Sequence, residues 1–125
     1  MKHERHFSLE QANAAIPWVT ERLERMRAAR VLLNDEEARQ ALTHASQGNG
    51  GGEPGKIVSE GFLDLRQALI ELQAAEVVLR DLERGLVDFP ALREDEEIYF
   101  CWEEGEETIG YWHDTESGYG GRRPL

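Results

Sequence analysis

Residues 96–104, E-E-I-Y-F-C-W-E-E, alternate polar and apolar side chains with a period of two, which is typical of a strand with one buried face. The apolar face of this run consists of Ile98, Phe100 and Trp102. A second alternating run follows at residues 106–114, E-E-T-I-G-Y-W-H-D, and Gly105 separates the two. The pattern predicts an antiparallel β-hairpin over about residues 97–113. Because an isolated hairpin is marginally stable in water, its aromatic face must pack on another element.

The chain before this hairpin has helical periodicity. Ser8 followed by Gln11 is the signature of a capping box, which predicts a helix start at this point. Apolar residues then recur at spacings of three and four, and they predict one helix from about residue 9 to 43. Pro17 cannot donate a hydrogen bond to the carbonyl of Asn13, so the helix should be kinked there.

A second helix is predicted over about residues 57–84. Leucine and alanine alternate along its apolar stripe, as they do where two helices pack closely in a coiled-coil manner, and Gly85 is placed to end it. Between the helices, residues 46–56 read S-Q-G-N-G-G-G-E-P-G-K and contain no apolar side chain. This composition predicts a flexible glycine-rich linker.

These elements predict a single α+β domain over residues 1–125. We expect a long antiparallel two-helix hairpin, a C-terminal antiparallel β-hairpin packed at its open end, and an irregular tail at residues 114–125. The helix register favours Asp64 or Glu71 as the partner of Arg30, and Arg22 or Arg25 as the partner of Glu76.

Two helices leave apolar flanks that need cover. The flank residues are Phe62, Leu69 and Val78. Part of the cover should come from the β-hairpin, and the remainder predicts a homodimer with a four-helix arrangement.

The formal net charge of −11 limits the classes of partner. The acidic excess lies after residue 45, so we expect no binding to nucleic acid and no binding to membranes, both of which depend on cationic surfaces. The polar start and the lack of an apolar run of about 20 residues favour a cytoplasmic location. Cys101 is the single cysteine, and its position in a strand favours a buried thiol over a nucleophile.

The antiparallel helix pair should bring the start of the first helix close to the end of the second. This geometry predicts a polar site at the open end, formed by Glu10, Asn13, Arg80, Asp88, Arg122 and Arg123. One interpretation is that backbone N–H groups of residues 118–121 and the two C-terminal arginines bind an anion. The alternative is that these arginines pair with the chain's own carboxylates.

A metal site is the second chemical interpretation of the C-terminal region. His113, Asp114 and Glu116 offer nitrogen and oxygen donors within four residues, and His6 could complete a shell suited to zinc or manganese. The alternative is that His113 ends a strand at the surface while Asp114 forms an Asx-turn.

Several separated motifs resemble one bacterial family, labelled domain of unknown function 2203. They are F-S-L-E-Q-A-N-A-A-I-P, G-L-V-D-F-P-A, I-Y-F-C-W, Y-W-H-D and G-Y-G-G-R-R-P-L, in this order along the chain. The resemblance implies a small cytoplasmic bacterial protein and no established activity. It also directs attention to the matching positions Glu10, Asn13, Pro17, Asp88, Pro90, His113, Asp114, Gly118, Gly121 and Arg122.

The sequence therefore leaves two classes of function open. The favoured class is a non-catalytic, homo-oligomeric interaction or scaffold module, which would recognise a partner protein through its helical faces or its acidic hairpin. The alternative is a divalent-metal-dependent enzyme or small-ligand-binding protein with a site around His113 and Asp114. No cofactor is expected apart from the divalent metal ion of this alternative.

Overall fold

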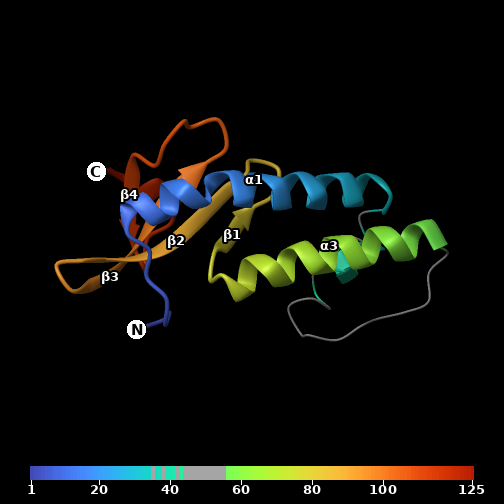
Figure 1. The fold of residues 1–125 in the computed structure, drawn as a ribbon, viewed down its shortest axis with the longest axis horizontal. Coiled ribbons are helices and arrows are strands. Elements are labelled where there is room, and N and C mark those ends of the chain that lie inside the picture. The colour runs from blue at the N-terminus through green and yellow to red at the C-terminus, as the bar shows by residue number, and fades with distance from the viewer. Residues whose placement is uncertain (35, 38, 42, 44–55) are drawn as a thin grey trace.

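The computed structural model describes residues 1–34, 36, 37, 39–41, 43 and 56–125. Helix α1 (Leu9–Val31) is followed by helix α3 (Lys56–Ala74) and then by a five-stranded antiparallel sheet (Figure 1). The remaining elements are β1 (Val78–Asp81), β2 (Leu86–Arg93), β3 (Glu96–Glu103), β4 (Tyr111–Asp114), the 3₁₀ turn η1 (Tyr119–Gly121) and β5 (Arg123–Pro124). The predicted α+β class is confirmed. The predicted linker at residues 46–56 lies outside the described residues except for Lys56, which begins α3.

Helix α1 begins as the sequence predicts but ends earlier. The Ser8 side chain accepts a hydrogen bond from the Gln11 N–H, and the Gln11 side chain accepts one from the Ser8 N–H. The helix ends at Val31 rather than near residue 43. The physical reason is a second reciprocal pair, in which Asn34 and Glu37 bond each other's main-chain N–H groups. Such a pair caps the start of a new helical segment, so it separates the helical residues 36, 37, 39–41 and 43 from α1.

Helix α3 is also shorter than the predicted helix over residues 57–84. It ends at Ala74 in a Schellman arrangement, in which the Val77 N–H bonds the Leu72 carbonyl and the Glu76 N–H bonds the Gln73 carbonyl. Glu76 takes the left-handed position with φ of 60°. Residues 78–81 form strand β1 instead of a further helical turn, and Gly85, with φ of 64°, lies in the turn between β1 and β2.

The two helices run antiparallel and pack closely. A Cβ atom added at Gly61 would lie 3.2 Å from the Ala29 carbonyl oxygen, so glycine permits the close approach of the helices. Ion pairs join the helices: the N–O distance is 3.0 Å between Arg22 and Glu71 and 3.1 Å between Arg25 and Asp64.

The predicted partners of Arg30 and Glu76 are wrong. Arg30 pairs with Glu83, and Glu76 holds the N-terminal residues instead. The helix register predicted from the sequence was offset, because it assumed a second helix that ends at residue 84, whereas α3 ends ten residues earlier at Ala74.

The strand order β1-β2-β3-β4-β5 follows the order in the chain. The predicted hairpin is present as β3 and β4, which pair from Ile98 opposite Asp114 to Cys101 opposite Tyr111. It is not an isolated hairpin, because β3 also pairs along its whole length with β2. Proline has no N–H group to donate to a neighbouring strand. Pro90 is nevertheless compatible with β2, because β1 pairs with β2 only as far as Asp88 and does not extend beside Pro90.

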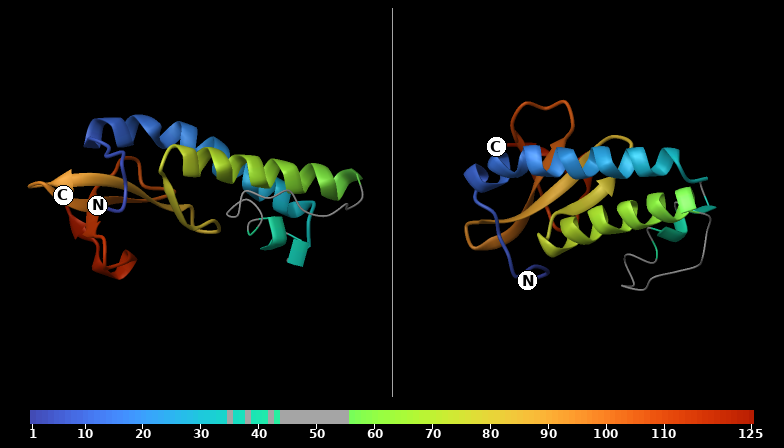
Figure 2. Two further views of the ribbon diagram at one scale, coloured as in Figure 1. Left: turned by 90° about the horizontal axis from the view of Figure 1, so that it is seen from below. Right: turned by 45° about the vertical axis from the view of Figure 1, so that its right-hand side comes forward.

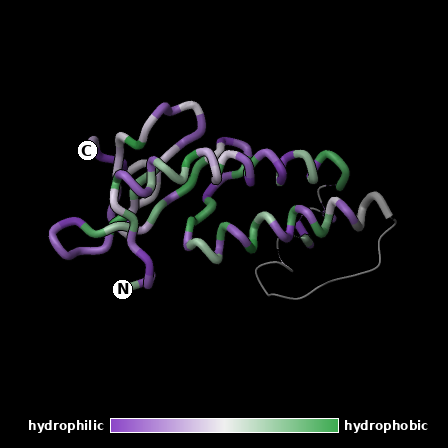
Figure 3. The backbone as a smooth tube through the Cα atoms, viewed as in Figure 1, coloured by the Kyte–Doolittle hydropathy of each residue, from purple (hydrophilic) through white to green (hydrophobic). Residues whose placement is uncertain are grey.

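The sheet has two different faces. The inner face packs on α1 and α3 and carries Val87, Phe89, Ala91, Ile98, Phe100 and Trp102. The outer face is turned away from the helices, and the C-terminal tail lies on that side (Figure 2). Hydrophobic and hydrophilic residues alternate along both helices, and α1 ends in a hydrophobic stretch (Figure 3). Neither helix in the described part of the chain has an apolar stretch sufficient to cross a bilayer.

Candidate functional site

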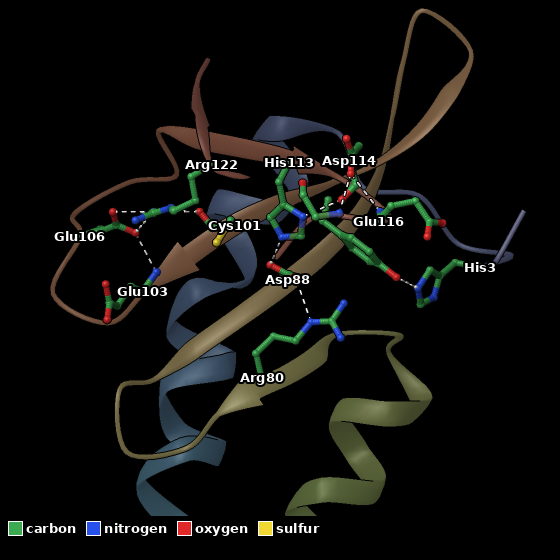
Figure 4. Close-up of polar contacts among 12 residues, drawn as sticks. His3, Arg80, Asp88, Cys101, Glu103, Glu106, His113, Asp114, Glu116 and Arg122 are labelled. Atoms are coloured by element: carbon green, nitrogen blue, oxygen red, sulfur yellow. Dashed lines mark hydrogen bonds and ion pairs between the residues drawn. The ribbon is translucent and has the colours of Figure 1, made fainter. Parts of the chain in front are cut away.

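Three side chains from neighbouring strands meet on the outer face of the sheet. Asp88 of β2 is paired with Cys101 of β3, and His113 of β4 is paired with Tyr99, two residues before Cys101. Because side chains alternate along a strand, Asp88, Cys101 and His113 share one face (Figure 4). Each is only 1% exposed. We call these three residues the buried cluster.

Asp88 is held between two cationic groups. Its Oδ2 atom accepts a hydrogen bond from Arg80 Nε at 2.8 Å, and its Oδ1 atom lies 3.0 Å from His113 Nε2. The Arg80 guanidinium also lies 5.2 Å from the centre of the Tyr99 ring, and 42% of the Arg80 side chain is exposed. A buried carboxylate is costly unless it is paired, and these two contacts satisfy both of its oxygens.

His113 has both ring nitrogens engaged. Nδ1 lies 2.7 Å from the main-chain carbonyl oxygen of Asp114, which can only accept, so Nδ1 carries a proton. The other ring nitrogen, Nε2, faces Asp88. Burial alone would lower the pKa of His113, but hydrogen bonding with the Asp88 carboxylate, the Cys101 side chain and the Asp114 carbonyl outweighs burial and raises this pKa to about 10.

The buried cluster contains the residue types of a cysteine-nucleophile triad without its geometry. In such a triad the histidine uses one nitrogen for the thiol and the other for the carboxylate. Here Asp88 occupies Nε2, and Nδ1 is taken by a main-chain carbonyl. Cys101 is a free thiol that is almost fully buried, so a substrate could not reach it. The predicted burial of Cys101 is confirmed.

The donor atoms of the buried cluster have a spacing suited to a metal ion. One donor atom from each residue lies within 4.8 Å of the other two. Two ligands bound to zinc at about 2.0–2.1 Å in a tetrahedron are about 3.3 Å apart, close to the 3.0 Å between His113 Nε2 and Asp88 Oδ1. The Nδ1 bond to a main-chain carbonyl is the contact that usually orients a metal-binding histidine.

The metal ligands expected from sequence are not assembled, apart from His113. Asp114 Oδ1 accepts hydrogen bonds from the Glu116 N–H at 2.9 Å and the Ser117 N–H at 2.6 Å, as the Asx-turn alternative predicts. The same alternative is wrong in placing His113 at the surface, because its side chain is buried between neighbouring strands. The Ser117 N–H is the main cause of the lowered pKa of Asp114. Glu116 is highly exposed and pairs with Lys2. His6 Nε2 lies 2.8 Å from Glu97.

The polar site expected at the open end is divided by the sheet. Arg80 and Asp88 do meet, on the outer face. Asn13 lies on the helical side, where its Oδ1 accepts a hydrogen bond from the Ile109 N–H at 2.8 Å. Glu10 is exposed in the first turn of α1. The side chains cannot converge, because the sheet separates α1 from the outer face.

The two C-terminal arginines have different surroundings. Arg122 donates to Glu106 at 2.7 Å and lies 4.0 Å from the centre of the Tyr111 ring. This contact agrees with the alternative that the arginines pair with the chain's own carboxylates. Arg123 instead lies 5.1 Å from the centre of the Trp112 ring.

Cys101 is the site residue that sequence reasoning missed. The alternation that assigned Ile98, Phe100 and Trp102 to one face also placed Tyr99 and Cys101 together on the other. A second signal was Asp88, a carboxylate inside the apolar run G-L-V-D-F-P-A, which required a buried partner.

A model for the family described as "Uncharacterized conserved protein (DUF2203)" matches residues 5–125. No curated protein and no solved structure matches the chain.

Proposed function

Because the chain belongs to the DUF2203 family, whose description names no activity, we propose from the geometry that it is a metal-binding protein with a non-catalytic zinc-type centre. The ligands in this proposal are Asp88, Cys101 and His113. The observation that carries it is the convergence of one oxygen, one sulfur and one nitrogen donor within 4.8 Å on three adjacent strands.

The donor set favours a borderline-soft divalent ion. Calcium and magnesium take oxygen ligands almost exclusively, whereas zinc accepts a mixed set of thiolate, imidazole and carboxylate. The charge also balances. A carboxylate, a thiolate and a neutral imidazole around Zn²⁺ sum to zero, as do the carboxylate, thiol and imidazolium in the metal-free cluster. Exchanging protons for the ion therefore adds no net charge to the buried site.

The burial of the ligands favours a non-catalytic role. Three protein ligands are common in catalytic zinc sites, where the fourth position is open to water and substrate. Here each ligand is only 1% exposed, so a substrate has no direct access to the ion. A bound ion would instead hold β2, β3 and β4 together.

Metal content and cobalt spectroscopy test this proposal. After chelator treatment, the protein should take up one equivalent of Zn²⁺ or Co²⁺, and Co²⁺ should produce a sulfur-to-cobalt charge-transfer absorption that requires Cys101. Free zinc at a hundred times its dissociation constant should raise the free energy of unfolding by about 2.7 kcal/mol. Cys101→Ser should abolish the absorption, and His113→Gln should weaken binding by more than the roughly 10–100-fold effect of an outer-shell change.

His6→Gln and Asp114→Asn are the matched controls, because they alter the same residue types outside the buried cluster. Both should retain the cobalt absorption. Equal loss in these controls would assign the ion to the ligands first expected from sequence. Absence of metal uptake by the wild-type chain, with an unchanged melting temperature, would refute the proposal without reference to any variant.

A homodimeric interaction module is the second candidate. The argument that apolar helix flanks need cover from a second subunit is weakened, because Phe62 and Leu69 are already buried in the single chain, at 8% and 9% exposure. The acidic hairpin is also engaged internally, through Glu104 with Arg27 and Glu103 with Arg84. A different observation favours association: the far end of the helix pair exposes Val31, Leu32 and Leu63, at 85%, 48% and 55%.

A further inference from the structure

A cleft of about 420 Å³ lies on the helical side of the sheet, separate from the buried cluster. Its apolar walls come from the residue Phe7 just before α1, from the N-terminal half of α1 and from the turn between α3 and β1. They are formed by Phe7, Ala14, Ala15, Trp18, Ala75 and Val77. The volume is in the range of small-molecule sites, which are about 300–1,000 Å³.

The cleft is open because its walls are short. Ala14, Ala15 and Ala75 contribute only methyl groups, whereas the Trp18 ring provides a large apolar surface. Trp18 is fixed from one side by Arg22, whose guanidinium lies 4.0 Å from the centre of the ring. Phe7 is fixed by an edge contact with Phe89 of the inner face, with ring centres 5.3 Å apart. The walls are therefore rigid aromatic groups on either side of a gap.

Arg5 supplies a positive charge at this apolar cleft. Its guanidinium lies 4.1 Å from the centre of the Phe7 ring and makes one long hydrogen bond, of 3.4 Å, to the Ala75 carbonyl. No ion pair is present for the Arg5 side chain among the described residues, although the chain has 25 acidic and 14 basic side chains. The nearby Glu76 carboxylate is already engaged by the main-chain N–H groups of Glu4 and Arg5 and by His3.

We propose that this cleft binds a linear aliphatic carboxylate, with the alkyl chain along the alanine-lined gap and the carboxylate on Arg5. A guanidinium matches a carboxylate through two parallel hydrogen bonds. The net charge of −11 repels anions in proportion to their charge, so a monoanion with a long apolar part is favoured over phosphorylated ligands. This inference does not depend on the metal centre.

Equilibrium dialysis with decanoate, below its micelle concentration and with metal-free protein, tests the proposal. Wild-type protein should bind one equivalent saturably. Arg5→Gln should weaken decanoate binding at least tenfold while leaving the weaker binding of decanol unchanged. Ala15→Leu should reduce the binding of both compounds, because the larger side chain fills the gap.

Arg93→Gln is the matched control, since Arg93 is an exposed arginine at the far end of β2 that contacts Trp112. It should bind decanoate as the wild type does. An equal loss of decanoate affinity in this variant would mean that binding depends on the overall charge of the protein and not on the cleft. No saturable binding, or equal affinity of wild type and Arg5→Gln, would overturn the proposal. The melting temperature of each variant verifies folding.

Discussion

At the scale of single residues, the turn between β2 and β3 is built from unusual amino acids. Arg93 pairs with Glu96, which leaves a two-residue loop of Glu94 and Asp95. Both residues have positive φ, of 51° and 66°. This conformation belongs to a type I′ turn, which asparagine and glycine occupy with less strain than other residues. The loop therefore costs stability that a better turn sequence would recover.

We predict that the double substitution Glu94→Asn and Asp95→Gly stabilises the protein by about 1–2 kcal/mol, because it relieves two strained φ angles. Urea unfolding at neutral pH measures the change. Glu107→Gln serves as the control, since it removes an exposed charge without altering a turn. A gain of the same size in the control would attribute the effect to reduced acidic repulsion, and no gain in the double variant would contradict the prediction.

The same turn explains why the buried cluster could not be predicted from sequence. Alternation assigned Cys101 to the face opposite Phe100, and the apolar surroundings of Asp88 indicated that it needs a partner. The pairing of β2 with β3 was missing, because Glu94 and Asp95 carry no glycine or asparagine signal of a hairpin. Without that register, the neighbour of Asp88 could not be identified.

At the scale of elements, the N-terminal arm, residues 1–7, is fixed by two carboxylates. Glu76 accepts hydrogen bonds from the main-chain N–H groups of Glu4 and Arg5. Glu97 accepts bonds from the N–H groups of Lys2 and His3, at 2.7 and 3.0 Å. Glu76 takes a left-handed position that glycine would fill with less strain, and its side chain anchors the arm.

Glu97 should make stability depend on acidic pH. Burial alone would raise the pKa of Glu97, but hydrogen bonds from His6 and from the N–H groups of Lys2 and His3 lower it from 4.5 to about 2. A lowered folded-state pKa means that the unfolded chain binds the proton first. The stabilisation is complete above pH 4.5 and disappears as the pH falls towards 2.

We predict that Glu97→Gln reduces the free energy of unfolding at pH 7 by up to about 3 kcal/mol, since each pKa unit corresponds to about 1.4 kcal/mol. The difference from wild type should shrink between pH 4.5 and pH 2. Urea unfolding at several pH values provides the measurement, with the exposed neighbour Glu96→Gln as control. A difference that stays constant down to pH 2.5 would show that packing, and not ionisation, is the cause.

Element boundaries were harder to predict than element types. Both helices and the β3–β4 hairpin were expected, but both helices were predicted too long. The end of α1 had a signal, the capping pair Asn34 and Glu37, which the continuing apolar periodicity concealed. The end of α3 had none, because Glu76 occupies the position that glycine usually marks.

At the scale of the whole molecule, ion pairs join parts that are distant in the chain. Arg27 of α1 binds Glu104 after β3, and it also donates to the carbonyl of Leu82 in the β1–β2 turn. Arg122 of the tail donates to Glu106 and to the carbonyl of Cys101. Carboxylates from the acidic second half of the chain thus form ion pairs with arginines of distant segments, and these pairs hold the parts of the domain together. At the far end of the helix pair, Val31, Leu32 and Leu63 are among the large apolar side chains that the described residues expose.

We predict that this far end forms a homodimer contact through Val31, Leu32 and Leu63. Isolated exposed apolar residues are common, but several on one end of a molecule indicate an interface. Light scattering at micromolar concentration should give twice the chain mass of 14.2 kDa. Leu63→Glu should halve that mass and leave the far-ultraviolet circular dichroism unchanged, because the side chain is 55% exposed and contributes little to the core.

Leu92→Glu is the matched control for the dimer, since Leu92 is also an exposed leucine, at 46%, but lies at the other end of the molecule in β2. It should remain dimeric. A monomeric wild-type chain at micromolar concentration would contradict the prediction, and dissociation of both variants would place the contact elsewhere. Repeating the measurement after chelator treatment separates this contact from the metal centre. The two lie on different parts of the fold, so a dimer that survives metal removal is the expected result.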